Sequence, residues 1–424
     1  MLTATNPQTA PSLSAQSDRF YALDAVRAFA LIIGIFFHGV ESFVSYVLGS
    51  IWATHDSQHS VSLDAFFYVA HVFRMQAFFV IAGYFAHLLY HRKGANGFLQ
   101  NRTRRILIPL VLFWPILYTS TWLLWSWGSY QAGPSVSQLS YWDKVAQNLP
   151  SFISFKDSFL AFLHLWFLYY LALFCGGVLL LRPVVARFDS FGSLRYGVDK
   201  VLAYLMRKWW GGLTLSLLII LPMSGMKGWF GVDTPNQGLV PMWAPFVLYG
   251  LFFSLGWLLN RQPGILDGFR KYWRQNLLIS GLLIAGLTVF FLNLVYSIAS
   301  ASQTHHVQAP DPATTASILL ILNSVYAFAS MTAVFAFIGF ILTYFDKPSP
   351  RIRYLSDASY WLYLIHLPVV IFFQILVAPL QIHWLLKMSL IFVPSFAILF
   401  LTYHYGVRNT WLGVLLNGRR YPLK

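Results

Sequence analysis

Four ionisable side chains interrupt the apolar stretch RFYALDAVRAFALIIGIFFHGVESFV, residues 19–44: Asp24, Arg27, His38 and Glu41. A histidine beside a carboxylate can act as a general base, because the carboxylate orients the imidazole and stabilises its protonated form. The sequence offers no G-x-S-x-G nucleophile elbow to accompany this pair. The chemistry that we expect is therefore deprotonation of an incoming hydroxyl group by His38.

A helix over this stretch places the polar residues on one face. At about 100° and 1.5 Å per residue, Asp24, Arg27, Gly34, His38 and Glu41 fall within an arc of about 100°. Arg27 and His38 lie eleven positions apart, or ~16 Å along the axis. We call this face the polar stripe. It links a basic end at Arg27 with a histidine end at His38.

A second apolar segment, DAFFYVAHVFRMQAFFVIAGYFAHLLY, carries His71 and Arg74 on one face. Counted from the centres of the two segments, His38 and Arg74 match in depth, as do Glu41 and His71. One interpretation is purely structural, with Asp24 paired to Arg27 and Glu41 paired to Arg74 to hold helices in register. We favour a functional site, since register alone does not require two histidines at this depth, and Arg74 could stabilise an oxyanion.

Composition indicates a membrane protein: of the 424 residues, 57% are hydrophobic and only 10% are charged. Long apolar runs favour helices over the alternating segments of a barrel. The first twenty residues do not resemble a signal peptide, so the first span is expected to be retained. The single cysteine, Cys175, rules out an internal disulfide and a Cys-based zinc site, and we expect no metal.

The apolar runs predict an all-α polytopic membrane protein of about ten transmembrane helices. Most Lys and Arg residues fall in alternate connections and in both tails, which places both termini in the cytoplasm by the positive-inside rule. The net charge of +15 thus reflects topology, and no nucleic-acid partner is expected. We predict a flexible N-terminal tail (1–18), a single membrane domain (19–406) and a basic C-terminal tail (407–424). The ten predicted spans are 21–48, 65–90, 106–127, 159–181, 211–226, 241–259, 276–298, 315–345, 358–379 and 382–406.

A basic cluster, RKGANGFLQNRTRRILIP, follows the second span and includes Arg102, Arg104 and Arg105. Arginine suits a polyanionic donor because it makes bidentate contacts with phosphate. Cytoplasmic loops are basic for topological reasons as well, so the cluster alone is a weak signal.

The chain resembles the membrane acyltransferases of acyltransferase family 3. The matching pieces, in order, are LDAVRAFALIIGIFFH, FRMQAFFVIAGYF, RTRRILIP, HLWFLYYL (164–171) and ASYWLYLIHLPVV (358–370). The resemblance covers about 19–404. Where the family has the motif FFxxSGY, this chain has Ala82 in place of serine, which leaves close helix packing as the expected role of Ala82 and Gly83.

The resemblance implies transfer of an acyl group, succinyl or acetyl, from cytoplasmic acyl-CoA to a hydroxyl of a periplasmic or extracellular glycan, with an osmoregulated glucan as the expected acceptor. It implies that His38 is the catalytic base with Arg27 as its required partner, and that Arg102 and Arg105 form an R-x-x-R pair at the donor side. No permanently bound cofactor is expected. The expected location is the inner membrane, as a multi-pass protein embedded in lipid and in contact with glycan-synthesis machinery.

The residues that we expect at the site form three sets: catalytic, His38, Glu41, Arg74, Arg27 and Asp24; donor-binding, Arg102, Arg104 and Arg105; and substrate-binding, His71, His164 and Trp166. Structural roles compete for the last set, since tryptophan is common at membrane interfaces. A multi-span transporter that uses the buried charges as a proton or anion path is the alternative function. A non-catalytic anchor for a glycan synthase is a third.

Overall fold

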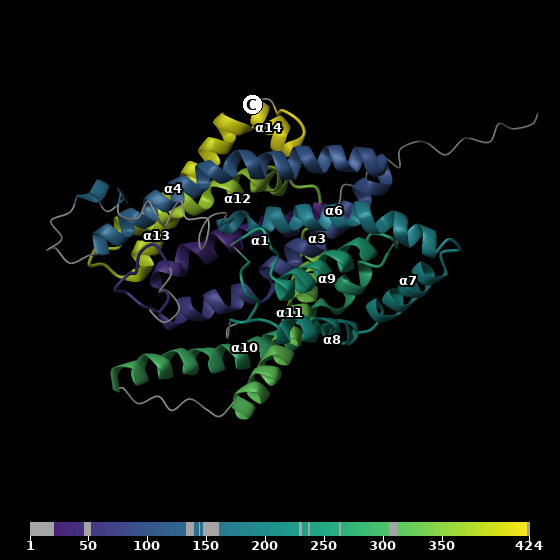
Figure 1. Cartoon of the computed structure of the whole chain (residues 1–424), viewed down its shortest axis with the longest axis horizontal. Helices are drawn as coiled ribbons and strands as arrows, with labels where there is room; N and C mark the ends of the chain where they lie inside the picture. Colours follow the sequence, from purple (N-terminus) through teal and green to yellow (C-terminus); the bar gives the residue numbers. More distant parts are fainter. Residues whose placement is uncertain are drawn as a thin grey trace, which may run out of the picture.

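The computed structural model describes residues 21–45, 52–132, 140–143, 145–146, 161–228, 231–235, 238–262, 264–304 and 312–421. Throughout these ranges the regular structure is helical, and they contain no strand. The helices form the bundle seen in Figure 1. The chain is therefore an all-α polytopic membrane protein, as its sequence predicts.

Helices and shorter helical turns follow one another along the bundle. In the first half these are α1 (Tyr21–Val40), the 3₁₀ turn η1 (Glu41–Phe43), α3 (Val61–Arg102), the π-helical turn η2 (Thr103–Leu107), α4 (Ile108–Ala132), the 3₁₀ turn η3 (Leu163–Leu165), α6 (Trp166–Phe188) and α7 (Ser193–Met206). In the second half they are α8 (Gly211–Ser224), α9 (Trp243–Leu259), α10 (Asp267–Thr304), α11 (Pro312–Tyr344), α12 (Pro350–Val377), α13 (Trp384–Leu401), the π-helical turn η4 (Thr402–Val407) and α14 (Trp411–Asn417).

Seven helical stretches of the described ranges are long and apolar enough to cross a membrane. One of them, Val61–Gln131, contains two predicted spans joined end to end. The chain bends between them at Gly94, whose φ of 67° and ψ of 178° are not helical, so the bend falls at a residue without a Cβ. The two shorter apolar helices, α8 and α9, correspond to the fifth and sixth predicted spans.

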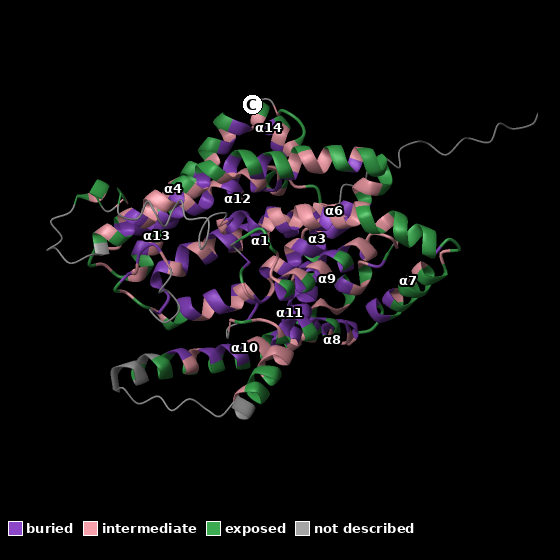
Figure 2. Cartoon of the chain, in the orientation of Figure 1, coloured by how far each residue is buried: buried purple, intermediate pink, exposed green. Residues whose placement is uncertain are grey.

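The core of the bundle forms where α1 packs against α3, α11 and α12, and where α3 packs against α9. Figure 2 shows burial concentrated on these inner helices, whereas the outer lengths of α4, α10 and α13 are exposed. The exposed side chains there are apolar, among them Val111, Leu278 and Val393. Exposed apolar faces along whole helices would aggregate in water but match the hydrocarbon core of a bilayer.

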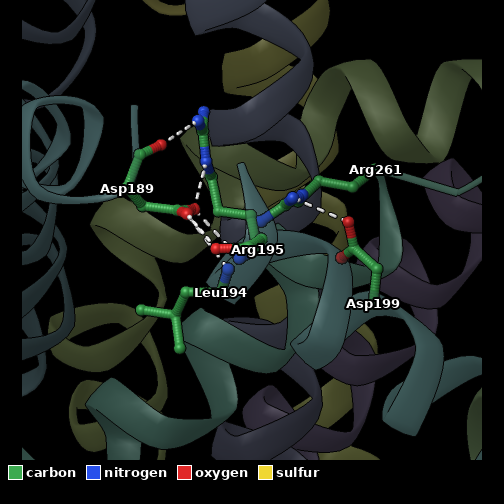
Figure 3. A network of polar contacts seen from close by, with 6 residues as sticks. Asp189, Leu194, Arg195, Asp199 and Arg261 are labelled. Carbon is green, nitrogen blue, oxygen red and sulfur yellow. Dashed lines mark hydrogen bonds and ion pairs between the residues drawn. The ribbon is translucent and has the colours of Figure 1, made fainter. Parts of the chain in front are cut away.

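Two helices that the sequence did not predict lie in basic segments, one in a connection and one in the C-terminal tail. The first, α7, is docked by Asp189 (Figure 3): its carboxylate accepts hydrogen bonds from the amides of Leu194 (3.0 Å) and Arg195 (3.0 Å) and from Nε of Arg195 (2.8 Å). Arg261 reaches the same helix through a 2.7 Å ion pair with Asp199. The second, α14, lies within the predicted C-terminal tail.

One ion pair is completely enclosed. Lys387 in α13 places its Nζ 2.8 and 2.6 Å from the two carboxylate oxygens of Asp56, and the side chains are 0% and 1% exposed. The amide of Asp56 also donates to the carbonyl of Ser42 in η1. The pair thereby anchors the segment that follows α1 to α13.

Candidate active site

The polar stripe of α1 begins at a basic end that contacts α12. Arg27 lies 3.5 Å from Asp24, one turn earlier in the helix. Its Nη2 donates to both the carbonyl (2.9 Å) and the hydroxyl (2.6 Å) of Ser356 in α12. The expected pair of Asp24 and Arg27 is therefore present, and it ties the first turns of α1 and α12 together.

At the other end of the stripe, Nδ1 of His38 lies 2.8 Å from Oε2 of Glu41. When Glu41 is ionised its carboxylate can only accept, which places the proton on Nδ1 and leaves the lone pair on Nε2. The two side chains keep 18% and 16% of their surface exposed, so they border accessible space. This is the arrangement of a base and its orienting carboxylate that the sequence predicted.

Arg74 reaches α1 from the neighbouring helix α3. Its Nη1 lies 3.4 Å from the carbonyl of Gly34, and its guanidinium lies 4.1 Å from the centre of the Phe37 ring. In the described ranges no carboxylate approaches this guanidinium within 4.0 Å, because Glu41 pairs with His38 instead. The register pair of Glu41 and Arg74 is thus not formed, and a buried cation faces the site.

His71, one turn from Arg74, is held by α11. Its Nδ1 lies 3.3 Å from the hydroxyl of Tyr326, and the same hydroxyl lies 3.3 Å from the backbone carbonyl of His71. Phe37 bridges the two sides, with its ring 6.1 Å from that of His71. His71 therefore contacts α1 through the ring of Phe37, whereas Arg74 contacts the backbone of α1.

Two further histidines extend from His38 in a row of neighbouring rings, His366 and then His164. The ring centre of His366 in α12 lies 5.3 Å from that of His38, and the ring centre of His164 in η3 lies 5.1 Å from that of His366. Nδ1 of His366 donates to the carbonyl of Tyr363 at 2.7 Å, which leaves its Nε2 as an acceptor. Although three imidazoles meet here, no group of metal-binding side chains converges in the part of the chain that the structure describes.

A proline explains how His164 is fixed. Pro368 has no amide hydrogen, so the carbonyl of Leu364, four residues earlier, lacks its usual partner within α12. Nε2 of His164 donates to this carbonyl at 2.8 Å. The expected substrate-binding histidine is thus docked on α12 by a bond that the proline makes available.

Gln374 connects His38 to a tryptophan. Its Nε2 donates to the carbonyls of His38 (2.9 Å) and Gly39 (3.0 Å), and its Oε1 accepts from Nε1 of Trp52 (3.0 Å). The indole of Trp52 lies parallel to the His38 ring, with centres 6.0 Å apart and planes 10° apart. Gln374 is 1% exposed and uses both ends of its amide, so it clamps the last turn of α1. Sequence reasoning missed both residues.

The expected donor residues lie around the π-helical turn η2, a rare geometry that often marks functional sites. Arg102 lies over the ring of Phe98 at 5.1 Å, and the hydroxyl of Tyr360 in α12 donates to the carbonyl of Arg105. Arg104 points outward and is exposed. The structure thus brings Arg105 to the basic end of the stripe, close enough to both Arg27 and Arg102 for repulsion between like charges.

Trp166 lies in the core, 6% exposed, with its ring 5.3 Å from that of Tyr249 and 6.3 Å from that of Phe79. Its placement matches a packing role. Gly83 also packs closely: a methyl group there would overlap the backbone carbonyl of Phe253 in α9, and one at Gly256 would overlap that of Val80. Gly83 and Gly256 thus mark the close approach of α3 to α9.

Helix α12 contacts both ends of the polar stripe. From one end to the other it carries Ser356 against Arg27, Tyr360 against Arg105, His366 beside His38, and Gln374 against the last turn of α1. Ser356 and Gln374 lie eighteen residues apart, or ~27 Å. The basic end and the histidine end of the polar stripe are therefore both in contact with one helix, α12.

A family model described as an acyltransferase domain matches residues 20–404. The chain belongs to this family. Among curated proteins, glucans biosynthesis protein C from Escherichia coli strains O81 (ED1a), SMS-3-5 and K12 is 25% identical over 414 residues, covering 95% of this chain and 95% of each relative. No solved structure matches the chain. The chain is accordingly a multi-pass membrane enzyme that transfers acyl groups.

Proposed function

We propose that this acyltransferase moves an acyl group, succinyl or acetyl, from acyl-CoA at the cytoplasmic face of the inner membrane to a hydroxyl of a periplasmic or extracellular glycan. The observation that carries the proposal is the partly exposed pair of His38 and Glu41 at one end of a stripe whose other end is basic. The names of the relatives support a glucan as the acceptor. Glycan-synthesis machinery is the expected partner in the membrane.

In the proposed mechanism, Nε2 of His38 takes the proton of the acceptor hydroxyl as its oxygen attacks the thioester carbon. Glu41 stabilises the imidazolium that forms. Arg74 stabilises the negative charge that develops on the carbonyl oxygen, because a buried cation interacts strongly there. The C–S bond then breaks, the electron pair leaves on sulfur, and the proton passes from His38 to the thiolate.

Donor binding belongs to the basic end. Arg27, Arg102 and Arg105 would contact phosphate groups, and the ~16 Å between Arg27 and His38 is the distance that the acyl-bearing arm of the donor has to span. The polar stripe provides the path along α1. No metal takes part in the proposed steps.

The test uses purified protein with His38→Ala. We expect donor binding to persist while transfer to glycan is lost, because the base is removed and the basic end is intact. A His59→Ala variant is the matched control, since His59 is an exposed histidine that has no place in the proposed site. Retained transfer by His38→Ala would remove His38 from the mechanism. Solute uptake by proteoliposomes without acyl-CoA consumption would favour a transporter.

A further inference from the structure

The C-terminal segment packs on the basic end of the site. Helix α14, at the top of Figure 1, contacts η2 and α12. It ends at Gly418, whose φ of 76° is left-handed. A methyl group at Gly418 would overlap the guanidinium of Arg105. The glycine thus allows both the turn and the direct contact of the tail with a donor-binding arginine.

Beyond Gly418, two more arginines lie near the ring of Tyr421. The guanidinium of Arg419 lies 4.5 Å from the centre of the Tyr421 ring, and that of Arg408 lies 5.9 Å from it. The amide of Tyr421 donates to the carbonyl of Arg408 at 3.0 Å, which closes the tail onto the end of η4. Arg408 also lies 5.5 Å from the ring of Tyr354 in α12. The tail is therefore held in place at the basic end.

This arrangement concentrates positive charge with few carboxylates to balance it. In the described ranges, Arg105, Arg408 and Arg419 have no carboxylate within 4.0 Å. Of the nearby acids, Asp24 pairs with Arg27, whereas Asp357 pairs with Arg353 and also hydrogen-bonds with the side chain of Tyr421. Like charges brought together repel one another, and a bound polyanion would offset that cost. The positive-inside rule accounts for basic residues in a tail but not for the placement of Arg408 and Arg419 against the ring of Tyr421, three residues after the contact of Gly418 with Arg105.

We infer that the C-terminal segment forms the nucleotide end of the donor site. Arg408 and Arg419, together with Arg105, would bind the adenosine 3′,5′-bisphosphate part of acyl-CoA, while the thioester extends along the polar stripe to His38. Arginine suits this ligand because its planar fork pairs with phosphate oxygens. The inference rests on the proposed function, since it assigns the part of the donor that lies farthest from the reaction.

The test compares two donors, acyl-CoA and acyl-pantetheine, which carry the same thioester but differ in the nucleotide. For Arg419→Ala we expect the KM for acyl-CoA to rise about tenfold, with kcat unchanged. The KM for acyl-pantetheine should not change. Arg420→Ala is the matched control, because Arg420 is an exposed neighbour of equal charge that does not stack on Tyr421. It should behave as the wild type with both donors.

Equal effects of Arg419→Ala and Arg420→Ala, or an equal rise in KM for both donors, would overturn the inference. The proposed function would survive that result, since the wild type would still transfer from either donor. Absence of transfer from both donors would overturn the proposed function as well. Binding of adenosine 3′,5′-bisphosphate to the unaltered full-length protein, measured by calorimetry, is independent of any variant's folding. Weaker binding to Arg419→Ala supports the inference, and absence of binding to the wild type contradicts it.

Discussion

His38 and Glu41 are three residues apart, yet they belong to different helices: His38 lies in the last turn of α1 and Glu41 opens the 3₁₀ turn that follows. Their side chains meet at 2.8 Å between Nδ1 and Oε2. The change of helix type thus coincides with the carboxylate that fixes the proton on Nδ1. It leaves Nε2 as the nitrogen that can accept a proton.

Glu41→Gln should lower kcat for acyl transfer by about 10²–10⁴-fold while the KM for the donor stays constant. The reason is that glutamine is nearly isosteric but cannot stabilise the imidazolium of His38. Steady-state kinetics with purified protein in detergent provides the measurement. A variant with the wild-type kcat would show that Glu41 has no part in catalysis.

Gln374→Glu should lower kcat by about 100-fold, since displacing a catalytic group by about 1 Å has effects of this size. The carboxylate can still accept from Trp52 but cannot donate to the carbonyls of His38 and Gly39. Trp52→Phe is the comparison, because it keeps an aromatic ring beside His38 and loses only the bond to Gln374. It should retain more activity, and the opposite order would contradict the clamp. Kinetics with both substrates separates kcat from KM.

Lys387→Ala should destabilise the protein by about 3–5 kcal/mol, because it leaves the carboxylate of Asp56 buried without its cation. The double variant Lys387→Met, Asp56→Leu should lose less, since neither charge remains. Unfolding in detergent, followed for the wild type, Lys387→Met, Asp56→Leu and the double variant, gives the coupling free energy. Additive losses would mean that the pair contributes no coupling.

The docking of α7 by Asp189 should depend on pH. Burial acts to raise the pKa of its carboxyl group, but hydrogen bonds from the side chain and amide of Arg195 and the amide of Leu194 outweigh this and lower the pKa to about 2. Because this value lies below the ordinary 3.8, the carboxylate stabilises the docked α7 fully above about pH 4, and the contribution is lost as the pH falls towards 2.

Hydrogen exchange of the α7 amides at neutral pH and near pH 2.5 measures this dependence. The wild type should lose protection on acidification, after correction for intrinsic exchange rates. Asp189→Asn should already have low protection at neutral pH and change little further. Equal protection of wild type and variant at both pH values would exclude this role for Asp189.

Local periodicity explains what the sequence could predict. The positions of Arg27, His38 and Glu41 on one face follow from the turn of a helix, and the equal depths of His38 and Arg74 follow from two helices of known length. Whether Glu41 pairs with Arg74 or with His38 depends on side-chain geometry across a helix boundary, so both alternatives were open. The structure selects His38.

Long-range contacts explain what the sequence could not predict. Gln374 lies 336 positions from His38, and no local pattern distinguishes it from other polar residues of α12. The same holds for Trp52, which reads as an interfacial tryptophan. Helix α14 was hidden in a short basic tail, where composition indicates topology rather than structure. Trp166 lies two positions from His164 in the sequence, but its side chain packs into the core.

Pro368 has a consequence for any attempt to engineer this protein. Alanine at this position would be the obvious stabilising exchange, since it restores an amide to the middle of α12. That amide would then compete with His164 for the carbonyl of Leu364. The substitution should therefore stabilise α12 but weaken the hydrogen bond that holds His164 beside His366. We expect a higher melting temperature together with a lower turnover rate.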